Sequence, residues 1–223
     1  NTCIDTLILF LTTRVRFMLV FSFRRLKQLF SYSSKILVSS LISVIYDEIN
    51  PLIIGIRFTG ADLSYYTKGK SFPTLISNTI SDTFSAVLFP VISQLQDDTE
   101  AVLRYTRRFM KVSSYLVFPL MVGFLAVSDN FVSVVLTDKW MAASIYIQIF
   151  CLSYMFNIIQ NGNLQAIRAI GRSDIILILE IIKKSLYLAI ILSFIFLSDK
   201  PEMLAVTSIV NTVIATVINT FPN

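Results

Sequence analysis

The sequence predicts an all-α fold, a polytopic transmembrane helix bundle. Hydrophobic residues make up 55% of the 223-residue chain and charged residues only 15%, and the mean hydropathy is +0.72, far above that of an average soluble domain. The apolar residues fall into runs close to the ~20 residues that a helix needs to cross the hydrocarbon core. The net charge of +5 comes from basic residues clustered between these runs. Such clusters are typical of membrane-flanking loops and not of a nucleic-acid-binding face.

Six apolar segments are predicted to span the membrane: residues 36–56, 71–93, 113–128, 142–166, 174–197 and 202–221. Residues 1–13 are expected to form the end of a preceding transmembrane helix, and residues 14–35 a cytoplasmic connection. Between the third and fourth spans, the apolar run in SDNFVSVVLTDKW is too short to cross the membrane. We expect this segment to lie at the interface, with Lys139 and Trp140 anchoring it at headgroup level.

Basic residues are distributed unevenly between alternate loops. One set of loops contains most of them, and the opposite set contains only Arg57, Lys139 and Lys200. The positive-inside rule places the richer set in the cytoplasm. The predicted cytoplasmic segments are residues 14–35, 94–112 and 167–173, and the predicted external segments are residues 57–63, 129–141 and 198–201.

Residue types narrow the chemistry that the chain could perform. The chain has no histidine, which excludes His-based acid–base catalysis, Ser–His and Cys–His nucleophile pairs and His-containing metal sites. Cys3 and Cys151 lie in separate apolar segments, so neither a disulfide framework nor a CxxC site is predicted. No Gly-rich phosphate loop follows a strand, so ATP use is not indicated. We therefore expect no catalytic residue, no metal site and no cofactor.

Polar residues recur at helical spacing within several predicted spans. The stripe in the second span contains Lys70, Ser71, Thr74, Ser77, Asn78, Ser81, Asp82 and Ser85, with Phe72, Ile76, Ile80, Phe84 and Val87 on the other side. Similar stripes occur in residues 36–56, 142–166 and 202–221, but not in 113–128. Hydrogen bonding between packed helices would explain any one stripe. Four stripes, two of them with carboxylates, favour a hydrated cavity between the helices.

Three charged residues interrupt the fifth span. Glu180, Lys183 and Lys184 share one helical face, and Glu180 is expected to pair with Lys184 at i,i+4, leaving Lys183 in excess. Inserting three charges costs about 8–10 kcal/mol, which nearly cancels the roughly 5–10 kcal/mol gained from the Leu, Ile and Phe residues of the run. A lipid-facing position is therefore implausible. Two interpretations remain: a structural charge pair that snorkels, or a cationic site for an anionic substrate beside the cavity.

Several stretches together resemble a known family. They are ADLSYYTKGKSFPTLISNTISDTFSAVLFPVISQLQDD, VFPLMVGFLAVSDNFVSVVLTDKW, and NGNLQAIRAIGRSD running into LEIIKK. In this order they are similar to signatures of bacterial polysaccharide exporters, the Wzx-type lipid-linked oligosaccharide flippases of the MOP superfamily, which also holds the MATE drug exporters. The resemblance covers about residues 22–200. It implies two six-helix lobes around a central cavity, with residues 36–221 as the second lobe and the amino-terminal lobe missing.

The resemblance also implies a function. An undecaprenyl-pyrophosphate-linked oligosaccharide, such as an O-antigen, capsule or exopolysaccharide unit, would cross the bacterial cytoplasmic (inner) membrane by alternating access. The implied partners are this lipid-linked oligosaccharide, membrane lipids and the missing amino-terminal lobe, with no nucleic acid. Two features depart from the family pattern: Asp47 and Glu48 in IYDEINP replace expected neutral polar residues, and Lys70 in SYYTKGK replaces a small residue. The net charge of the cavity is therefore left open.

The candidate residues of the substrate cavity are Asp47, Glu48, Lys70, Asn78, Asp82, Asn161, Glu180, Lys183 and Lys184. Two other functions remain open. A MATE-like cation-coupled antiporter of drugs or small molecules would use Asp47, Glu48 and Asp82 as coupling sites. A membrane polysaccharide polymerase or glycosyltransferase would need a sizeable loop to present catalytic groups, and none of the predicted loops is long enough. We therefore expect a transporter and not an enzyme.

Overall fold

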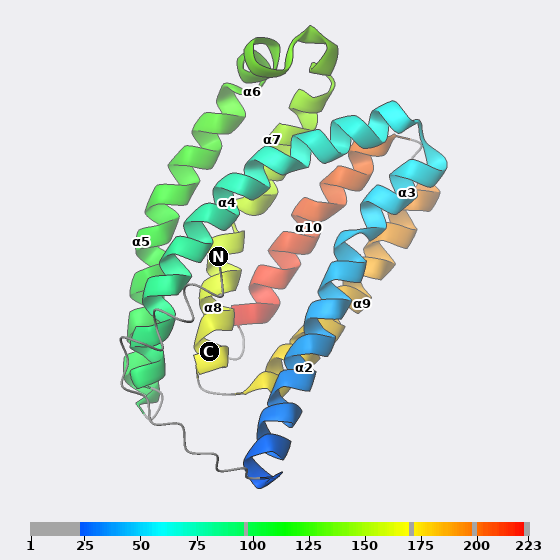
Figure 1. Cartoon of the computed structure of the whole chain (residues 1–223). Coiled ribbons are helices and arrows are strands. Elements are labelled where there is room, and N and C mark those ends of the chain that lie inside the picture. The colour runs from blue at the N-terminus through cyan, green and yellow to red at the C-terminus, as the bar shows by residue number, and fades with distance from the viewer. Residues whose placement is uncertain (1–22, 96–97, 170–171, 198–199, 221–223) are drawn as a thin grey trace, which may run out of the picture.

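A computed structural model describes residues 23–95, 98–169, 172–197 and 200–220. The predicted end of a preceding helix, residues 1–13, and residues 14–22 of the predicted connection lie outside these ranges. The elements are α2 (Phe23–Asp47), α3 (Ile49–Arg57), α4 (Gly60–Gln94), α5 (Thr99–Ala126), α6 (Ser128–Phe131), the π-helical turn η1 (Val132–Leu136), the 3-10 turn η2 (Asp138–Trp140), α7 (Ala143–Tyr154), α8 (Asn157–Ala169), α9 (Ser173–Leu197) and α10 (Pro201–Thr220) (Figure 1).

The predicted all-α membrane bundle is confirmed. Among the described residues, five helical segments are long and apolar enough to cross a membrane: Ser33–Arg57, Gly60–Gln94, Glu100–Ala126, Ala143–Arg168 and Pro201–Asn219. Helix α9, the remaining predicted span, is 25 residues long but includes the three charged residues. It packs lengthwise against α2 and α10. The chain is a multi-pass membrane protein.

Helices α2, α4 and α5 begin earlier than the hydropathy pattern predicts, because polar residues at helix ends remain helical outside the hydrocarbon layer. Helix α2 already includes residues 23–35, which were expected to be a connection. Helix α4 begins after a capping box, in which Asp62 N donates to Thr59 Oγ1 over 3.2 Å and Thr59 N donates to Asp62 Oδ2 over 3.0 Å. Helix α5 begins after Asp98, whose Oδ1 accepts a hydrogen bond from Ala101 N.

Two predicted spans are interrupted, which corrects the sequence prediction of continuous helices. Residues 36–56 divide at Glu48 into α2 and α3, because Pro51 has no N–H to donate to the carbonyl of Asp47. Residues 142–166 divide after Tyr154 into α7 and α8. The Tyr154 carbonyl instead accepts a hydrogen bond of 3.4 Å from Ser77 Oγ of α4.

The apolar core lies where α4, α5, α7 and α8 pack together. Four of the five residues predicted on the apolar side of α4 contact this core: Phe72, Ile76, Ile80 and Phe84. Val87 does not, and it is 69% exposed, since it lies where α4 faces outward. Gly69 brings α4 close to α7: a Cβ here would clash with Tyr146 and lie 2.9 Å from the Ala143 carbonyl oxygen. Only glycine fits this helix contact.

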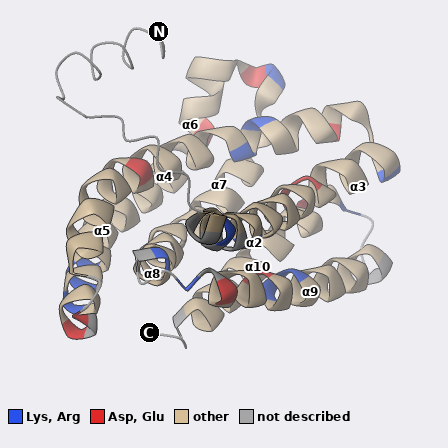
Figure 2. Cartoon of the chain, turned by 60° about the horizontal axis from the view of Figure 1, so that its bottom comes forward, with Lys and Arg blue, Asp and Glu red and all other residues tan. Residues whose placement is uncertain are grey.

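The connections alternate between the two ends of the bundle (Figure 1). One end holds the start of α2, the end of α4 with the start of α5, and the end of α8 with the start of α9; the other holds the α3–α4 connection, the α6–η1–η2 segment, and the end of α9 with the start of α10. This arrangement agrees with the predicted grouping of loops. Basic residues gather near the start of α5, which lies at the first of these two ends (Figure 2). That the first end faces the cytoplasm stays a prediction. At the other end, Trp140 packs edge-on against Tyr65, with ring centroids 5.8 Å apart.

Candidate functional site

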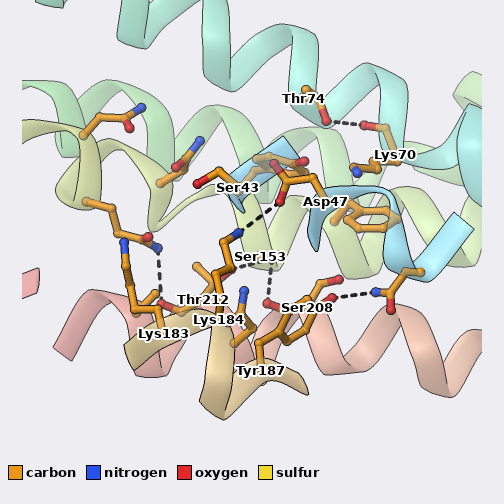
Figure 3. A pocket seen from close by; sticks show the side chains of 18 of the residues that line it. Ser43, Asp47, Lys70, Thr74, Ser153, Lys183, Lys184, Tyr187, Ser208 and Thr212 are labelled. Carbon is orange, nitrogen blue, oxygen red and sulfur yellow. Dashed lines mark hydrogen bonds and ion pairs between the residues drawn. The ribbon is translucent and has the colours of Figure 1, made fainter. Parts of the chain in front are cut away.

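A cavity of about 510 Å³ lies between α2, α3, α4, α7, α8, α9 and α10. Its wall is predominantly polar, and Figure 3 shows side chains from these helices pointing toward one another. None of the described α5 side chains contributes to the lining. Polar faces that would be unfavourable against lipid are therefore turned inward, as expected for a hydrated space within a bundle.

Eight of the nine candidate residues lie on this wall: Asp47, Glu48, Lys70, Asn78, Asn161, Glu180, Lys183 and Lys184. Their role in binding a substrate stays a prediction. Asp82 is the exception, because its side chain is exposed and does not line the cavity. Residues four apart advance by about 400° around a helix of 3.6 residues per turn. A row that begins at Lys70 therefore drifts about 120° before it reaches Asp82.

The charge pairs on the wall differ from the predicted ones. Lys183 Nζ contacts Glu180 Oε1, and these two side chains are only 7% and 9% exposed. Lys184 Nζ pairs instead with Asp47 Oδ1 of α2, at 3.4 Å (Figure 3). The predicted Glu180–Lys184 pair is therefore wrong, and Lys183 is not the excess cation. Spacings of three and four both bring helical side chains together, and the neighbouring helix decides between them by supplying a second carboxylate.

Helices α2, α3 and α9 run parallel with a constant register. Ser43 Oγ donates to Glu180 Oε2 over 2.9 Å, Lys184 contacts Asp47, and Asn50 Nδ2 donates to Tyr187 Oη over 2.7 Å, each pair separated by 137 residues in the chain. Farther along the bundle, Arg57 Nη1 at the end of α3 donates to the Ile195 carbonyl oxygen of α9. These contacts form a polar seam along one side of the cavity. Hydrogen bonds between transmembrane helices contribute about 0.6–2 kcal/mol each.

The wall carries balanced charge. Its cations are Lys70, Lys183 and Lys184, and its carboxylates are Asp47, Glu48 and Glu180. Two ion pairs join four of these six groups. Among the described residues, Lys70 and Glu48 have no ion-pair partner. The cavity wall formed by the described residues is therefore not strongly cationic, a point that the sequence left open.

Four asparagines on the wall have side-chain amides available to a ligand. Asn78, Asn157, Asn161 and Asn211 all line the cavity, and within the described ranges none of these amides has a hydrogen-bond partner. Other polar groups nearby are already paired, such as Ser153 Oγ with Thr212 Oγ1 at 2.9 Å. Each free amide offers both donors and an acceptor. Asn157 and Asn211 were missing from the predicted site, although both occur in polar stripes of the sequence.

Aromatic residues complete the wall. Tyr66, Phe150, Tyr154 and Tyr187 line it, and the Tyr66 and Phe150 rings meet edge to face with centroids 5.2 Å apart. Tyr154 and Tyr187 lie on polar faces of the predicted spans, although neither was among the candidate residues. Tyr66 and Phe150 were not predicted, because an aromatic residue within an apolar span is most often part of the lipid-facing or packed surface. The packing of the helices places all four on the same cavity wall as the free amides.

Both helix interruptions lie at the cavity. Asp47, Glu48 and Asn50 surround the first, and Tyr154 and Asn157 surround the second; all five line the wall. Irregular backbone at membrane depth is tolerated where it faces protein or a water-filled space. Within the described ranges, no three carboxylate or thiol side chains come together to hold a metal ion. The arrangement can bind a polar molecule, with hydrogen bonds as the main contacts.

The sequence of the chain is similar to those of known bacterial proteins. The family described as "Polysaccharide biosynthesis protein" matches residues 1–145. The chain belongs to this family. It is 27% identical to the teichuronic acid biosynthesis protein TuaB of Bacillus subtilis over 70% of its length, and 25% identical to the lipopolysaccharide biosynthesis protein WzxC of Escherichia coli over 67%. It is also 28% identical over 62% of its length to an uncharacterized membrane protein in the cps region of Klebsiella pneumoniae.

These matches confirm the resemblance to polysaccharide exporters. The matched region spans 32%, 30% and 28% of the three relatives, about a third of each. No solved structure matches the chain. The cavity thus occurs in a membrane protein of the polysaccharide biosynthesis family, and it is built by a segment much shorter than the relatives.

Proposed function

We propose that the chain forms part of a transporter that carries a lipid-linked oligosaccharide across the bacterial inner membrane. The observation that carries this proposal is the polar cavity of about 510 Å³ within an apolar bundle, in a chain that belongs to the polysaccharide biosynthesis family. The names of two relatives refer to teichuronic acid and lipopolysaccharide biosynthesis, which supports a glycan as cargo. Transport needs no covalent chemistry, so the proposed protein is not an enzyme.

The composition of the wall suits a sugar. The free amides of Asn78, Asn157, Asn161 and Asn211 can donate to and accept from sugar hydroxyls. The cavity volume lies within the ~300–1,000 Å³ typical of small-molecule sites. Because the other cavity lysines are paired, Lys70 is the cation that the described part of the wall offers to an acidic sugar or to the pyrophosphate. This lobe would then contact chiefly the glycan.

Alternating access supplies the mechanism. In this class of mechanism, two halves move around a binding site near the bilayer midplane, and interrupted helices frequently border that site. The breaks at Glu48 and after Tyr154 lie beside the cavity. The second half would be the amino-terminal lobe of the same protein. The polyprenyl tail would remain in the lipid while the glycan crosses through the cavity.

Complementation of a strain that lacks its own flippase tests the proposal. The full-length protein should restore surface glycan, whereas residues 1–223 alone should not. In the full-length protein, Lys70→Gln should lower export several-fold at unchanged membrane abundance. Asp82→Asn is the matched control, because this exposed residue lies on the same helix outside the cavity, and it should export normally. Failure of the full-length protein to restore glycan with any repeat unit offered would refute the proposed function.

A cation-coupled antiporter remains the alternative, because Glu48 lies at a helix break on the cavity wall and forms no ion pair with any described residue. This function predicts that the full-length protein exports cationic drugs and that Glu48→Gln abolishes this export. The two functions are separated by measuring drug resistance and surface glycan in the same strain. Drug resistance without surface glycan would favour the antiporter.

A further inference from the structure

Helix α5 has two opposite faces of different character. One face is buried against α4, α7 and α8, and it consists of Val102, Thr106, Phe109, Ser113, Val117 and Met121. The opposite face begins with four exposed basic residues at the spacing i, i+3, i+4 and i+7: Arg104, Arg107, Arg108 and Lys111. This spacing places the four side chains on one side of the helix. We call Arg104, Arg107, Arg108 and Lys111 the basic face of α5.

The basic face forms no ion pair within the described part of the chain. Glu100, one turn before Arg104, is exposed and lies at the start of α5, where the helix dipole favours a carboxylate. The positive-inside rule explains an excess of basic residues at this end of the bundle, but it does not require that they share one helical face.

The basic face is separate from the cavity. No described α5 side chain lines the cavity, and α5 lies on the opposite side of the bundle from α2 and α9 (Figures 1 and 2). It therefore points away from the polar seam and from the proposed glycan site. An anionic substrate in the cavity cannot be its partner.

The depth of the basic face indicates its partner. Helix α5 has 28 residues, so it is about 42 Å long, whereas the hydrocarbon core is about 30 Å thick. The excess of about 12 Å corresponds to about eight residues at the polar, amino-terminal end, so it places Arg104 at headgroup level, and the other three residues of the basic face follow within about 8 Å along the helix. Directly after the basic face, the same side of α5 presents Tyr115, which is 73% exposed, flanked by the exposed Val112 and Leu116. Basic, then aromatic, then apolar side chains follow the order of headgroup, interface and acyl chain.

We propose that the basic face of α5 binds the headgroups of anionic phospholipids, which on the predicted topology belong to the cytoplasmic leaflet. Long basic side chains reach phosphate oxygens from this depth by snorkelling. Their methylene stems and Tyr115 then cover the first part of the acyl chains. An acidic protein would instead need a docking surface clear of the acyl-chain region, which Tyr115 and its apolar neighbours do not provide.

The test measures lipid selectivity of the full-length protein. The protein is reconstituted in nanodiscs of equimolar phosphatidylglycerol and phosphatidylcholine, and the lipids that it retains after extraction are measured by native mass spectrometry. Wild type should retain phosphatidylglycerol preferentially. Arg107→Gln/Arg108→Gln should lower this preference by about fivefold for each charge removed, the factor that corresponds to about 1 kcal/mol per basic residue near a membrane surface.

Two further variants make the test specific. Arg107→Lys/Arg108→Lys keeps the charge and should keep the preference. Lys27→Gln/Lys35→Gln removes two charges from α2 at the same end of the bundle and should also leave the preference nearly unchanged. The proposal is overturned if wild type shows no preference, if the Arg→Gln pair retains it, or if the α2 control loses it equally. It is also overturned if an acidic protein copurifies through the basic face while lipid retention stays the same in every variant.

Discussion

Replacing Glu180 with glutamine should destabilise the protein strongly, because this carboxylate neutralises a buried lysine. Lys183 is its ion-pair partner, and the two side chains are only 9% and 7% exposed. Ser43 of α2 satisfies the second carboxylate oxygen. Removal of one member of a buried ion pair typically costs about 3–5 kcal/mol, because the remaining charge is left buried and unpaired. We expect Glu180→Gln and Lys183→Gln each to have a cost in this range.

The neighbouring ion pair supplies the comparison. Lys184 is 12% exposed and Asp47 is 64% exposed, with 3.4 Å between Nζ and Oδ1. Ion pairs that reach solvent typically contribute about 0–1 kcal/mol. Lys184→Gln and Asp47→Asn should therefore have small effects on stability. The double variant Glu180→Gln/Lys183→Gln should recover most of the loss, because both charges are gone.

The assay is a double-mutant cycle on the full-length protein in detergent. Thermal unfolding is followed by fluorescence-detected size-exclusion chromatography, and membrane abundance is scored in parallel. The Glu180 and Lys183 substitutions should be strongly coupled. The Glu180 and Lys184 substitutions should be nearly additive. If Lys184→Gln destabilises as much as Lys183→Gln, or if Glu180→Gln/Lys184→Gln is the double variant that recovers stability, the pairing inferred from the structure is refuted.

Three further predictions follow from other features. Gly69→Ala should lower stability by about 1–3 kcal/mol through overpacking, while the control Gly123→Ala, which has no neighbour within 4 Å, should raise it by about 0.5–1 kcal/mol; equal effects in a thermal unfolding assay would contradict the close contact. Asn50→Leu should cost about 1–2 kcal/mol in the same assay, because it removes two interhelical hydrogen bonds, and an unchanged melting temperature would argue against the polar seam. A membrane-impermeant thiol reagent should label cysteine at Gly60 but not at Arg107 in intact cells, and labelling at Arg107 would reverse the topology.

Much of the fold could be predicted from local patterns alone. Run lengths predict membrane spans because the bilayer thickness sets the required helix length. Residue spacing predicts which side chains share a face because the helical period is nearly constant. For this reason Lys70, Asn78 and Asn161 were correctly placed among residues that share the inward faces. Asp82 was placed wrongly, because residues spaced four apart drift around a long helix. The local sequence does not show where along α4 the contact with a neighbouring helix ends.

The sequence could not predict which ion pairs the charged residues form. Lys184 contacts a carboxylate 137 positions away, and no spacing rule within one helix can rank that contact against an i,i+4 pair. The choice depends on the parallel register of α2 and α9, which is a property of the packed bundle.

Hydropathy, periodicity and loop charge by themselves determined that this chain is an α-helical membrane protein with polar faces turned inward. Each of these patterns depends only on one segment and on whether water or lipid surrounds it. Only the tertiary structure decided that the cavity charges balance, that Lys70 and Glu48 have no ion-pair partner among the described residues, and that four free amides share the wall. Those properties depend on which side chains of different helices meet. Contacts between helices are selected by packing, and packing depends on the whole bundle at once.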